Sequence, residues 1–600
     1  MCGIFGYVGN KTNAATIVLD GLKRLEYRGY DSWGVAVVPT AKFTSKYQSD
    51  QLSNKIVVKK KAGKIGNASV ADMPKSTLAF GHTRWATHGG VTTENAHPHL
   101  DCTGTIALIH NGIFENYEEI KKKLIARGHH FKSETDTEVA VHLIEDYAKT
   151  LLFTKAVQKA FNDMKGLNAI IVLDIKDHTL IAARNGSPLI IGFSDDENFL
   201  ASDAAALLPH TKQVHFLEDD QMAILSARGV ILFDAKTGEH LYPKKQHLTW
   251  NVRDAEKGDY PYFMLKEIYE QPGVVADIAA AAAYTASKAS LITKSRGAYL
   301  VGCGTASYAA IAGEYLFSKI AKRHINVAIG SEFGYHLDFL NRDSLVIAIS
   351  QSGETMDILE SVKKAKQKGA KILALVNVLG STLYREADSR ILIAAGPEKG
   401  VASTKAFIGM LAHLTLLAYA VAGKTKDGVS VLERAIFSMK QVLSSRSVKK
   451  IQTLVQKVKN SDHIYVIGRG LSYPTALETA LKIKEISYIH AEGIAAGELK
   501  HGPLALITKG KPCIAFLPND ETYGANLAGA MEMKARGGYI IGVSHKPHEV
   551  FDYFIPVADA GEATIIPNVV AAQLLAYYLT IARGLDPDMP RNLAKSVTVK

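Results

Sequence analysis

The second half of the chain contains the same local pattern twice, and this repetition constrains its fold more than any other feature. A strand-like apolar run ends in a glycine turn and precedes a helix, first at residues 298–304 and again at 463–468. Aligning Val301-Gly302-Cys303-Gly304 on Ile467-Gly468-Arg469-Gly470 also brings Ser307-Tyr308 close to Ser472-Tyr473. Strands that alternate with helices build parallel sheets, so we expect two tandem, doubly wound α/β domains.

The first 240 or so residues have a different texture, with short strand-like runs broken by glycine turns. Predicted strands lie at 76–80, 105–110, 169–174 and 221–225. Two helices are predicted, at 14–25 and at 136–152, and Thr135-Asp136-Thr137-Glu138 is a good N-cap pattern for the second. This mixture predicts an α+β layered domain.

A chain of 600 residues exceeds what one hydrophobic core usually spans, so several domains are expected. The strand-like runs of the first part of the chain stop in the polar segment before residue 259, and this change predicts a linker. The predicted boundaries are a first domain at 2–240, a linker at 241–258, α/β domains at 259–440 and 441–591, and a polar C-terminal tail at 592–600.

Charge and cysteine usage exclude several classes of protein. The net charge of +11 is modest, and the densest basic patch, Lys59-Lys60-Lys61 with Lys64, lacks interleaved aromatic residues, so we expect no nucleic-acid partner. The four cysteines are far apart without a CxxC pair, which argues against a disulfide framework and a zinc site. We therefore expect a reducing cytoplasm, no metal and no cofactor.

Two apolar runs, at 406–423 and 568–584, raise the question of a membrane span. They occupy similar places in the two repeats, which favours buried helices of a repeated fold. The N-terminus lacks the charged-then-apolar pattern of a secretion signal. We expect a soluble protein with no membrane partner.

Cys2 stands directly behind the initiator Met. Removal of Met1 would leave one residue with both a thiol and a free α-amino group, whose pKa is ordinarily about 7.7–8.0. Such an amine can take the thiol proton directly or through one water molecule. Cys2 is therefore a candidate nucleophile that carries its own general base.

Four polar segments accompany Cys2, and each alone has a structural explanation. They are Arg28-Gly29-Tyr30-Asp31-Ser32, the segment from Gly81 to Gly89, His110-Asn111-Gly112, and the helix cap around Asp136. In this order and spacing they resemble the glutaminase domain of the N-terminal-nucleophile, or type 2, glutamine amidotransferases. The resemblance implies a domain of sandwiched sheets covered by helices.

The resemblance also implies roles for individual residues. Arg84 would bind the α-carboxylate of L-glutamine and Asp136 its α-ammonium group, with Trp85, Thr87 and His88 lining the pocket. The Asn111 amide and the Gly112 backbone N–H would stabilise the oxyanion of the tetrahedral intermediate.

In the second half, Ser350-Gln351-Ser352-Gly353-Glu354-Thr355 lies between a strand and a helix. Hydroxyls and backbone N–H groups at a helix N-terminus can bind an anion without Lys or Arg. The motif resembles the phosphosugar-binding signature of sugar isomerase (SIS) domains. The resemblance implies sugar-phosphate contacts from Thr305, Ser350, Gln351, Ser352, Thr355, Val401, Ser403 and Ala594. Ala306 stands where the family usually has a serine, so no phosphate contact is assigned to it or to Ser307.

Three further segments carry candidate acid–base groups: Lys482 with Glu485, His501, and the tail with Lys595. The tail matches the end of members of the isomerising glutamine–fructose-6-phosphate aminotransferase family nearly letter for letter, and the match implies that residues 592–600 fold over the sugar site. The resemblance now spans the chain and implies that Glu485 moves a proton from C1 to C2 of the sugar, while His501 opens the ring. Lys595 would form a Schiff base or assist ring opening, and Lys482 would stabilise developing charge.

The resemblance implies an enzyme that makes D-glucosamine 6-phosphate and L-glutamate from D-fructose 6-phosphate and L-glutamine, with internal ammonia transfer. A homodimer is expected. The alternatives are an amidotransferase for another phosphosugar, a deglycase-like isomerase and a sugar-phosphate-sensing regulator. A purine-type phosphoribosylamine synthase is disfavoured, because the second half lacks an acidic pyrophosphate-binding loop and has two sugar-isomerase-like repeats. The regulator would need a DNA-binding module, and the first half has a glutaminase pattern instead.

Overall fold

The computed structural model describes residues 2–40, 55–248 and 252–598, and the chain divides into two compact units. Unit 1 comprises Met1–Glu256 with Ser596–Lys600, and unit 2 comprises Lys257–Lys595. Met1, residues 249–251 of the predicted linker and the last two residues of the tail lie outside the described residues.

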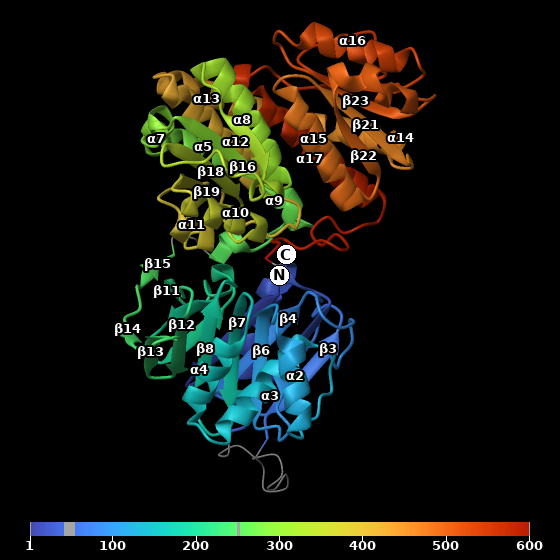
Figure 1. Ribbon diagram of the computed structural model, residues 1–600. Helices are drawn as coiled ribbons and strands as arrows, with labels where there is room; N and C mark the ends of the chain where they lie inside the picture. Colours follow the sequence, from blue (N-terminus) through green and yellow to red (C-terminus); the bar gives the residue numbers. More distant parts are fainter. Residues whose placement is uncertain (1, 41–54, 249–251, 599–600) are drawn as a thin grey trace. The chain divides into compact units, whose positions relative to one another are not determined.

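Unit 1 contains two antiparallel sheets (Figure 1). The eight-stranded sheet has the order β15-β11-β9-β10-β1-β4-β2-β3, and the seven-stranded sheet has the order β14-β13-β12-β8-β7-β6-β5. The first consists of β1 (Gly3–Gly9), β2 (Ser32–Val37), β3 (Val57–Ala62), β4 (Leu78–Arg84), β9 (Ile190–Phe193), β10 (Glu197–Ala201), β11 (Gln213–Phe216) and β15 (Gln246–His247). The second consists of β5 (His99–Leu100), β6 (Ile106–Gly112), β7 (Asn168–Asp174), β8 (Leu180–Asn185), β12 (Gln221–Ser226), β13 (Gly229–Asp234) and β14 (His240–Leu241).

The strand pleat explains how the two sheets and the helices on their outer faces form four layers. Alternate residues of a strand point to opposite faces. On β1, Ile4 and Val8 join the core between the sheets, whereas Phe5 and Tyr7 pack with helix α1 (Ala14–Leu25). The outer face of the other sheet packs against α3 (Asp136–Ala148) and α4 (Phe153–Asp163). The expected sandwich of sheets covered by helices is therefore present.

Unit 1 has two helices that the sequence analysis did not predict. One is α4, and the other is α2 (Tyr117–Ala126), in which Leu124 is the buried residue. The run Lys121-Lys122-Lys123 hides the weak amphipathic pattern of α2. The predicted linker is also partly ordered, because β15 pairs with β11 and a 3-10 turn, η4 (Val252–Ala255), follows. Shorter turns are η1 (Glu26–Arg28) and η3 (Ala204–Ala206).

Unit 2 contains two five-stranded parallel sheets, in the orders β17-β16-β18-β19-β20 and β22-β21-β23-β24-β25. In both, the second strand of the repeat lies outside the first, so the two repeats share one topology. The strands are β16 (Gly297–Gly302), β17 (Asn326–Ile329), β18 (Ser344–Ser350), β19 (Lys371–Val376), β20 (Ser389–Leu392), β21 (His463–Gly468), β22 (His490–Ala495), β23 (Pro512–Leu517), β24 (Tyr539–Ser544) and β25 (Tyr553–Pro556). This order confirms the prediction of tandem doubly wound domains, and it places a topological switch point between the first and third strands of each sheet.

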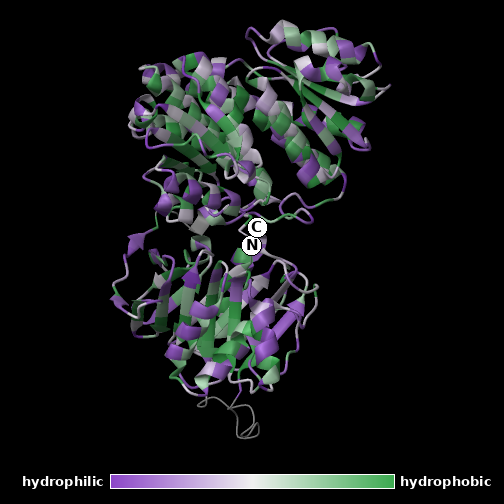
Figure 2. Cartoon of the chain, viewed as in Figure 1, coloured by the Kyte–Doolittle hydropathy of each residue, from purple (hydrophilic) through white to green (hydrophobic). Residues whose placement is uncertain are grey.

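One hydrophobic core joins the two repeats of unit 2. Two of its helices, α12 (Lys405–Val421) and α17 (Ile565–Ala582), are buried along almost their whole length, whereas other helices of the unit carry both green (hydrophobic) and purple (hydrophilic) residues in Figure 2. The helices of the unit are α5 (Phe263–Ala280), α6 (Ala282–Ala286), α7 (Ala289–Lys294), α8 (Thr305–Ala321), α9 (Gly330–Phe333), α10 (Met356–Gln367), α11 (Thr382–Glu386), α12 (Lys405–Val421), α13 (Thr425–Val442), α14 (Ser445–Val458), α15 (Ser472–Ser487), α16 (Tyr523–Lys534) and α17 (Ile565–Ala582), with 3-10 turns η5 (Ala496–His501), η6 (Pro503–Leu506) and η7 (Gly561–Thr564).

The two apolar runs of the sequence are α12 and α17. Within the described residues, one helical stretch, Gly561–Ala582, is long and apolar enough to cross a membrane by length and composition. However, 83% of its most apolar window is buried inside the structure. This burial favours a core helix.

Candidate functional site

Cys2 lies at the start of β1, where the neighbouring strand β4 ends. The Trp85 backbone N–H donates to Cys2 Sγ at 3.1 Å, and the thiol lies 3.5 Å from the Trp85 carbonyl oxygen. Burial raises the pKa of the thiol, so its nucleophilic form requires a base close by. The Gly29 backbone approaches so closely that a Cβ there would lie 2.8 Å from Trp85 N. The loop after η1 therefore closes directly on the cysteine site.

Asn111 reaches Cys2 from the end of β6. Its Nδ2 donates to the Cys2 carbonyl oxygen at 3.0 Å, and its Oδ1 lies 3.0 Å from His82 Nε2. Since His82 Nε2 also lies 3.1 Å from the His110 carbonyl oxygen, it faces two acceptors and must carry the proton. Burial lowers the pKa of His82 to about 3, so the ring is neutral. His82 thus orients the Asn111 amide with its N–H₂ toward Cys2, which sequence reasoning did not foresee.

Gly112 follows Asn111 in a conformation that suits only glycine. Its φ is +130°, and a Cβ there would lie 2.1 Å from the Leu167 carbonyl oxygen. The next strand therefore passes too close for any side chain at this position. This close approach fixes the backbone on which the predicted oxyanion site depends.

Arg84 ends β4 as a buried guanidinium. Its Nη1 donates to the Gly90 carbonyl oxygen at 3.0 Å, and its Nη2 donates to those of His88 and Gly89, the latter at 3.1 Å. Burial lowers the pKa of Arg84. Some of the Arg84 N–H groups therefore hold the 88–90 loop. This contact was not predicted and is separate from the predicted bidentate contact with a substrate carboxylate.

Asp136 is the first residue of α3 and is buried. Its Oδ2 accepts from the Phe114 backbone N–H at 2.8 Å, directly after β6. Thr135 caps the helix by accepting from the Glu138 backbone N–H at 3.3 Å. The carboxylate predicted to bind the substrate ammonium is therefore fixed to the segment that carries Asn111 and Gly112.

The three residues predicted to line the glutamine pocket follow Arg84. Trp85 packs edge-on against Tyr30, with ring centroids 5.5 Å apart, and His88 packs edge-on against Tyr117 at 5.6 Å. Thr87 is exposed between them. The structure brings Cys2, Arg84, Trp85, Asn111 and Gly112 together through backbone and side-chain contacts at the ends of β1, β4 and β6, which are inner strands of the two sheets.

The predicted sugar-phosphate loop of unit 2 begins at the carboxyl end of β18, beside the switch point. Ser350 Oγ accepts from the Gly353 backbone N–H at 3.0 Å and lies 2.9 Å from Thr355 Oγ1. Ser352 Oγ accepts from the Glu354 backbone N–H at 3.1 Å. Gly353 has a φ of +65°, which turns the loop into α10. The three hydroxyls thus cluster before a helix N-terminus, and Gln351 lies half-buried within the same turn.

Lys482, on α15, is buried in a cluster with two carboxylates of its own helix. Its Nζ lies 2.5 Å from Glu485 Oε2 and 3.4 Å from Glu478 Oε1, and it donates to Thr305 Oγ1 at 3.0 Å. Thr305 thus contacts Lys482, and the first repeat meets the second at this point. The structure brings together Lys482, Glu485 and Thr305 as a set.

Glu478 was not predicted, although it lies one helical turn before Lys482. Burial, together with repulsion from Glu485, raises its pKa to about 8 against the attraction of Lys482. Burial opposes the charge of Lys482, but Glu478 and Glu485 outweigh that effect and raise the pKa of the amine. Lys482 is therefore a cation, and Glu478 is a candidate proton carrier near neutral pH.

Lys595 is buried against the loop that follows β20. Its Nζ lies 2.6 Å from Glu398 Oε2 and donates to the Gly400 carbonyl oxygen at 2.7 Å. Burial opposes ionisation of Glu398, yet Lys595 and backbone N–H groups hold its pKa below the ordinary value. The Lys595 amine is therefore one half of a buried ion pair.

Glu267, on α5, lies behind this pair and was also not predicted. Its Oε1 accepts from the Lys399 and Gly400 backbone N–H groups at 2.5 and 3.1 Å. Burial, reinforced by Glu398, raises its pKa to about 7. The Glu267 carboxylate thus holds the 398–400 turn that Lys595 contacts.

Three of the remaining predicted residues lie near the 398–400 turn or beside Lys595 in the chain, and His501 lies apart from them. Val401 is buried and donates its N–H to the Asp588 carbonyl oxygen at 3.0 Å, and Ser403 Oγ donates to Glu398 Oε2 at 3.2 Å. Ala594 is half-buried beside Lys595 in the chain. His501 is exposed in η5, and within the described residues no hydrogen bond or ion pair links it to Lys482 or Lys595.

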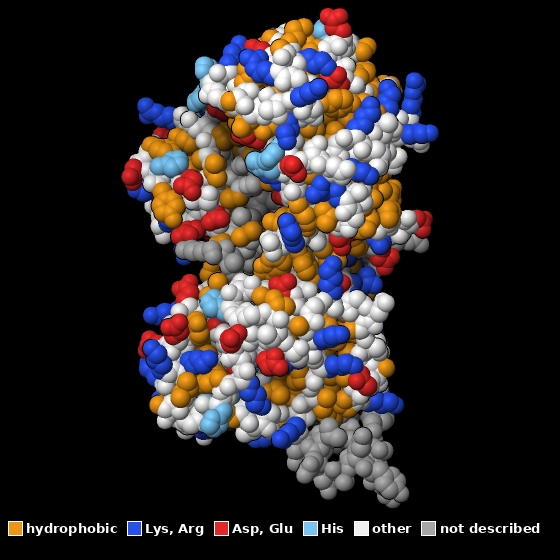
Figure 3. Space-filling view, turned by 90° about the vertical axis from the view of Figure 1, so that its right-hand side faces the viewer, with side chains coloured by type: hydrophobic (Ala, Val, Ile, Leu, Met, Phe, Trp, Pro, Cys, Tyr) orange, Lys and Arg blue, Asp and Glu red, His pale blue; other side chains and the backbone are white. Residues whose placement is uncertain are grey.

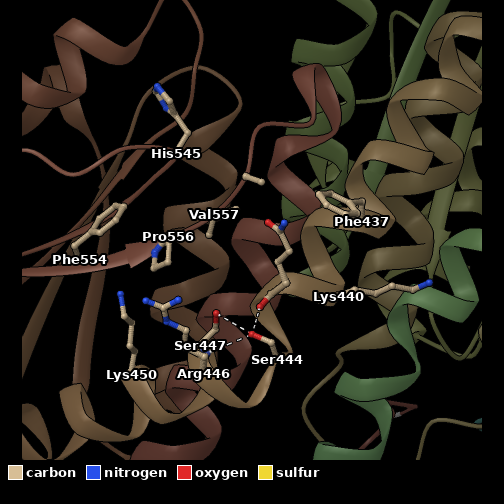
Figure 4. A pocket seen from close by; sticks show the side chains of 12 residues that line it. Phe437, Lys440, Ser444, Arg446, Ser447, Lys450, His545, Phe554, Pro556 and Val557 are labelled. Carbon is tan, nitrogen blue, oxygen red and sulfur yellow. Dashed lines mark hydrogen bonds between the residues drawn. The ribbon is translucent and has the colours of Figure 1, made fainter.

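Unit 2 also has a cavity of about 690 Å³ at which α13 and α14 face β25 (Figure 4). Lys440, Arg446, Lys450 and His545 line it, and none of the predicted sugar-site residues does. On the face drawn in Figure 3, basic and acidic side chains are interspersed.

Among the described residues, one group of side chains could hold a metal ion: Cys102, His129, His142 and Glu145. It contains none of the predicted catalytic or substrate-binding residues.

Two family models match the chain. The model described as "Glutamine amidotransferase domain" matches residues 82–209, and the model described as "SIS domain" matches residues 291–420 and 457–582. The first match lies in unit 1 and both others lie in unit 2, one on each parallel sheet.

Curated relatives cover the chain from end to end. A glutamine–fructose-6-phosphate aminotransferase (isomerizing) of Pyrococcus horikoshii is 43% identical over 614 residues, and one of Thermus thermophilus is 41% identical over 624 residues, each with 100% of both chains covered. A solved structure, the C-terminal domain of glucosamine-fructose-6-phosphate aminotransferase from Francisella tularensis, is 36% identical, covers 56% of this chain and 99% of its own, and has a TM-score of 0.52.

Proposed function

The chain belongs to the glutamine–fructose-6-phosphate aminotransferase (isomerizing) family, and we propose that its two units divide that reaction between Cys2 and the Lys482–Lys595 region. The enzyme uses glutamine and fructose 6-phosphate, as the family name states, and this fits synthesis of glucosamine 6-phosphate. Unit 1 would release ammonia from glutamine, and unit 2 would add it to the sugar and isomerise the product.

In unit 1, the Cys2 thiolate attacks the side-chain amide of glutamine after the free α-amino group has taken its proton. The oxyanion of the tetrahedral intermediate accepts hydrogen bonds from Asn111 Nδ2 and the Gly112 N–H. Arg84 binds the substrate carboxylate with donors that the 88–90 loop leaves available, and Asp136 binds its ammonium group. Ammonia leaves, and water releases glutamate from the thioester.

The contact that carries this half of the proposal is the hydrogen bond from Asn111 Nδ2 to the Cys2 carbonyl oxygen, 3.0 Å long. It places a side-chain amide donor beside the nucleophile, and the neutral His82 holds that amide in the donating orientation. An asparagine turned the other way would present an acceptor and repel an oxyanion.

In unit 2, the hydroxyls of Ser350, Ser352 and Thr355 bind the phosphate, helped by Gln351 and the α10 N-terminus. Lys595 forms the Schiff base with the opened sugar ketone after passing its proton toward Glu398, and water is lost. Ammonia then adds to this imine and displaces the lysine amine, which leaves the sugar imine that is isomerised. Glu485 moves the proton from C1 to C2, and Lys482 stabilises the enolamine. His501 assists ring opening. Val401, Ser403, Thr305 and Ala594 complete the walls of this site.

The cellular setting follows the same reasoning. We place the enzyme in the cytoplasm, where a reducing medium keeps the Cys2 thiol free. We expect a homodimer, and His501, which is exposed in one chain, is then available to a neighbouring copy. No nucleic acid or membrane is needed for the reaction.

A single assay tests the proposed function. Purified full-length protein is incubated with glutamine, with and without fructose 6-phosphate, and glutamate and glucosamine 6-phosphate are quantified. Equal amounts of both products are expected when both substrates are present. Glutamate without any amino sugar would leave unit 2 without its proposed role.

A further inference from the structure

Four side chains of unit 1, outside both candidate sites, converge on one point. Cys102 lies in the turn between β5 and β6, His129 follows α2, and His142 and Glu145 lie on one face of α3. One potential ligand atom from each falls within 4.8 Å of all the others. The spacing along the chain conceals this group, since Cys102 and His129 are 27 positions apart.

The distances match those between the ligands of a tetrahedral zinc ion. Bonds of about 2.0–2.1 Å to nitrogen and about 2.3 Å to sulfur place two nitrogens about 3.3 Å apart and nitrogen and sulfur about 3.5 Å apart. The two Nδ1 atoms of His129 and His142 are 3.4 Å apart, and Cys102 Sγ lies 3.8 and 3.5 Å from them. Glu145 Oε2 lies 3.0 and 2.9 Å from the same nitrogens. It would shift outward by a few tenths of an ångström, on the order of a thermal displacement.

The outer nitrogens of both imidazoles face carboxylates, as metal-binding histidines require. His129 Nε2 lies 3.4 Å from Asp146 Oδ1, and His142 Nε2 lies 3.7 Å from Glu138 Oε1. Lys149 Nζ lies 3.2 Å from the same Asp146 oxygen and 3.3 Å from His129 Nε2. With metal on Nδ1, each ring would carry its proton on Nε2. His129 could donate it to Asp146, whereas His142 Nε2, which has no hydrogen-bond partner among the described residues, would need Glu138 to move slightly closer.

From this geometry we propose that Cys102, His129, His142 and Glu145 bind one zinc ion. On binding, the Cys102 thiol releases its proton to solvent, both imidazoles stay neutral and Glu145 is a carboxylate, so the ion and its ligands sum to zero charge. Both imidazoles are buried, whereas Cys102 is exposed and leaves a path for the ion to enter.

Four protein ligands fill a tetrahedral shell, so the site is structural and leaves no position for substrate. The ion would join the β5–β6 turn and the segment after α2 to α3. The same helix begins with Asp136, so the metal would stiffen the element that carries the glutamine-site carboxylate.

The test uses untagged full-length Cys2→Ala protein, because a free N-terminal thiol and amine could themselves chelate zinc. After equilibration with buffered zinc and dialysis, elemental analysis should find about one zinc ion per chain. Cys102→Ser and Glu145→Gln should each reduce that content at least tenfold, while Cys513→Ser, which changes a buried cysteine of β23, should retain it. Absence of bound zinc, or equal zinc in the Cys102→Ser protein, would overturn the proposal in favour of a metal-free hydrogen-bonded cluster.

A second measurement keeps the test decisive if a variant misfolds. Cobalt added to the zinc-free Cys2→Ala protein should produce the strong visible bands of a four-coordinate ion and a thiolate charge-transfer band. Zinc should displace both signals and raise the midpoint of thermal unfolding, because it binds the folded state. Weak bands of six-coordinate cobalt would contradict the proposed ligand set.

Discussion

Buried lysine–carboxylate pairs hold the side chains of the proposed sugar site of unit 2 in place. Lys482 and Lys595 are both removed from water, and each has a carboxylate partner within 2.6 Å. Burying an ion costs several kcal/mol, and removal of one partner of a buried pair typically costs about 3–5 kcal/mol. Both lysines are therefore positioned by charge pairing. Each amine can react as a nucleophile or a base only after it has given up a proton, and its partner carboxylate is the nearest acceptor.

Glu478→Gln tests the carboxylic acid beside Lys482. Its pKa of about 8 exceeds the unfolded value of about 4.3, so the folded state binds more protons between these pH values. The free energy of unfolding of the wild type should therefore fall relative to that of Glu478→Gln as pH rises from 5 to 8, by at most about 1.4 kcal/mol per pH unit.

Urea unfolding of both proteins at three pH values measures this difference, with the exposed Glu549→Gln as the matched control. The control should follow the wild type at every pH. Parallel curves for Glu478→Gln and the wild type would mean that Glu478 is ionised across the range.

Gly112→Ala tests the close approach at the glutamine site. A Cβ at 2.1 Å from the Leu167 carbonyl oxygen forces the strands apart, so glutamate production should fall by at least a hundredfold. Gly63→Ala is the control, because its φ is +95° but nothing lies within 4 Å of the added atom. Equal losses in the two variants would attribute the effect to backbone strain alone.

At the residue scale, sequence reasoning identified side chains but not their partners. Cys2, Arg84 and Asn111 could be identified because their segments occur in a recognisable order. Glu398 could not, since it pairs with Lys595 across 197 positions and no local pattern encodes that meeting. His82 was overlooked because a histidine in a buried strand is usually only a core residue.

The arrangement of elements determines where the proposed sugar site lies. In each parallel sheet of unit 2 the first and third strands are neighbours, and the connections after them lead to opposite sides of the sheet order. Both Thr305 and the Ser350–Thr355 loop follow the carboxyl ends of such strands. The alternation of strand, glycine turn and helix was therefore enough to predict the sheets and the loop. The helices α2 and α4 of unit 1 were not predicted, because α2 buries little apolar surface and both are short.

Asp588 links two distant elements and offers a test at this scale. Its carboxylate accepts the Phe263 and Met264 backbone N–H groups at 2.7 and 2.8 Å, and so caps α5 from far along the chain. Loss of such a cap costs about 0.5–2 kcal/mol. Asp588→Ala should lower the denaturation midpoint of unit 2 accordingly, with a smaller loss for Asp588→Asn, which keeps one acceptor oxygen.

Circular dichroism and fluorescence in increasing urea report this change, and glutamate production serves as the internal control. Unit 1 should hydrolyse glutamine normally in both variants. An unchanged midpoint in Asp588→Ala would show that solvent replaces the cap without cost.

On the scale of the whole molecule, the chemistry segregates with the units. All groups assigned to glutamine lie in unit 1, and all groups assigned to the sugar lie in unit 2. The change of texture near residue 240 predicted this division, and the observed boundary falls between Glu256 and Lys257. The sequence alone could not predict that β15 extends the unit 1 sheet into the expected linker.

Lys595→Arg should separate the two activities. Arginine preserves the charge opposite Glu398 but forms no Schiff base and releases no proton, so glucosamine 6-phosphate synthesis should be lost while glutamine hydrolysis continues. Lys509→Arg, an exposed exchange in the same unit, should leave both activities unchanged. Near-normal amino-sugar synthesis by Lys595→Arg would exclude a covalent role.

The most direct test of the division of labour follows the nitrogen itself. Full-length protein is given glutamine labelled with ¹⁵N in its side-chain amide, unlabelled ammonium in excess, and fructose 6-phosphate, and the glucosamine 6-phosphate is analysed by mass spectrometry. If Cys2 releases ammonia for use within the same enzyme, nearly all product carries ¹⁵N, and Cys2→Ala forms no labelled product. Product that carries mainly the unlabelled nitrogen would contradict internal transfer, and labelled product from Cys2→Ala would contradict the role of Cys2.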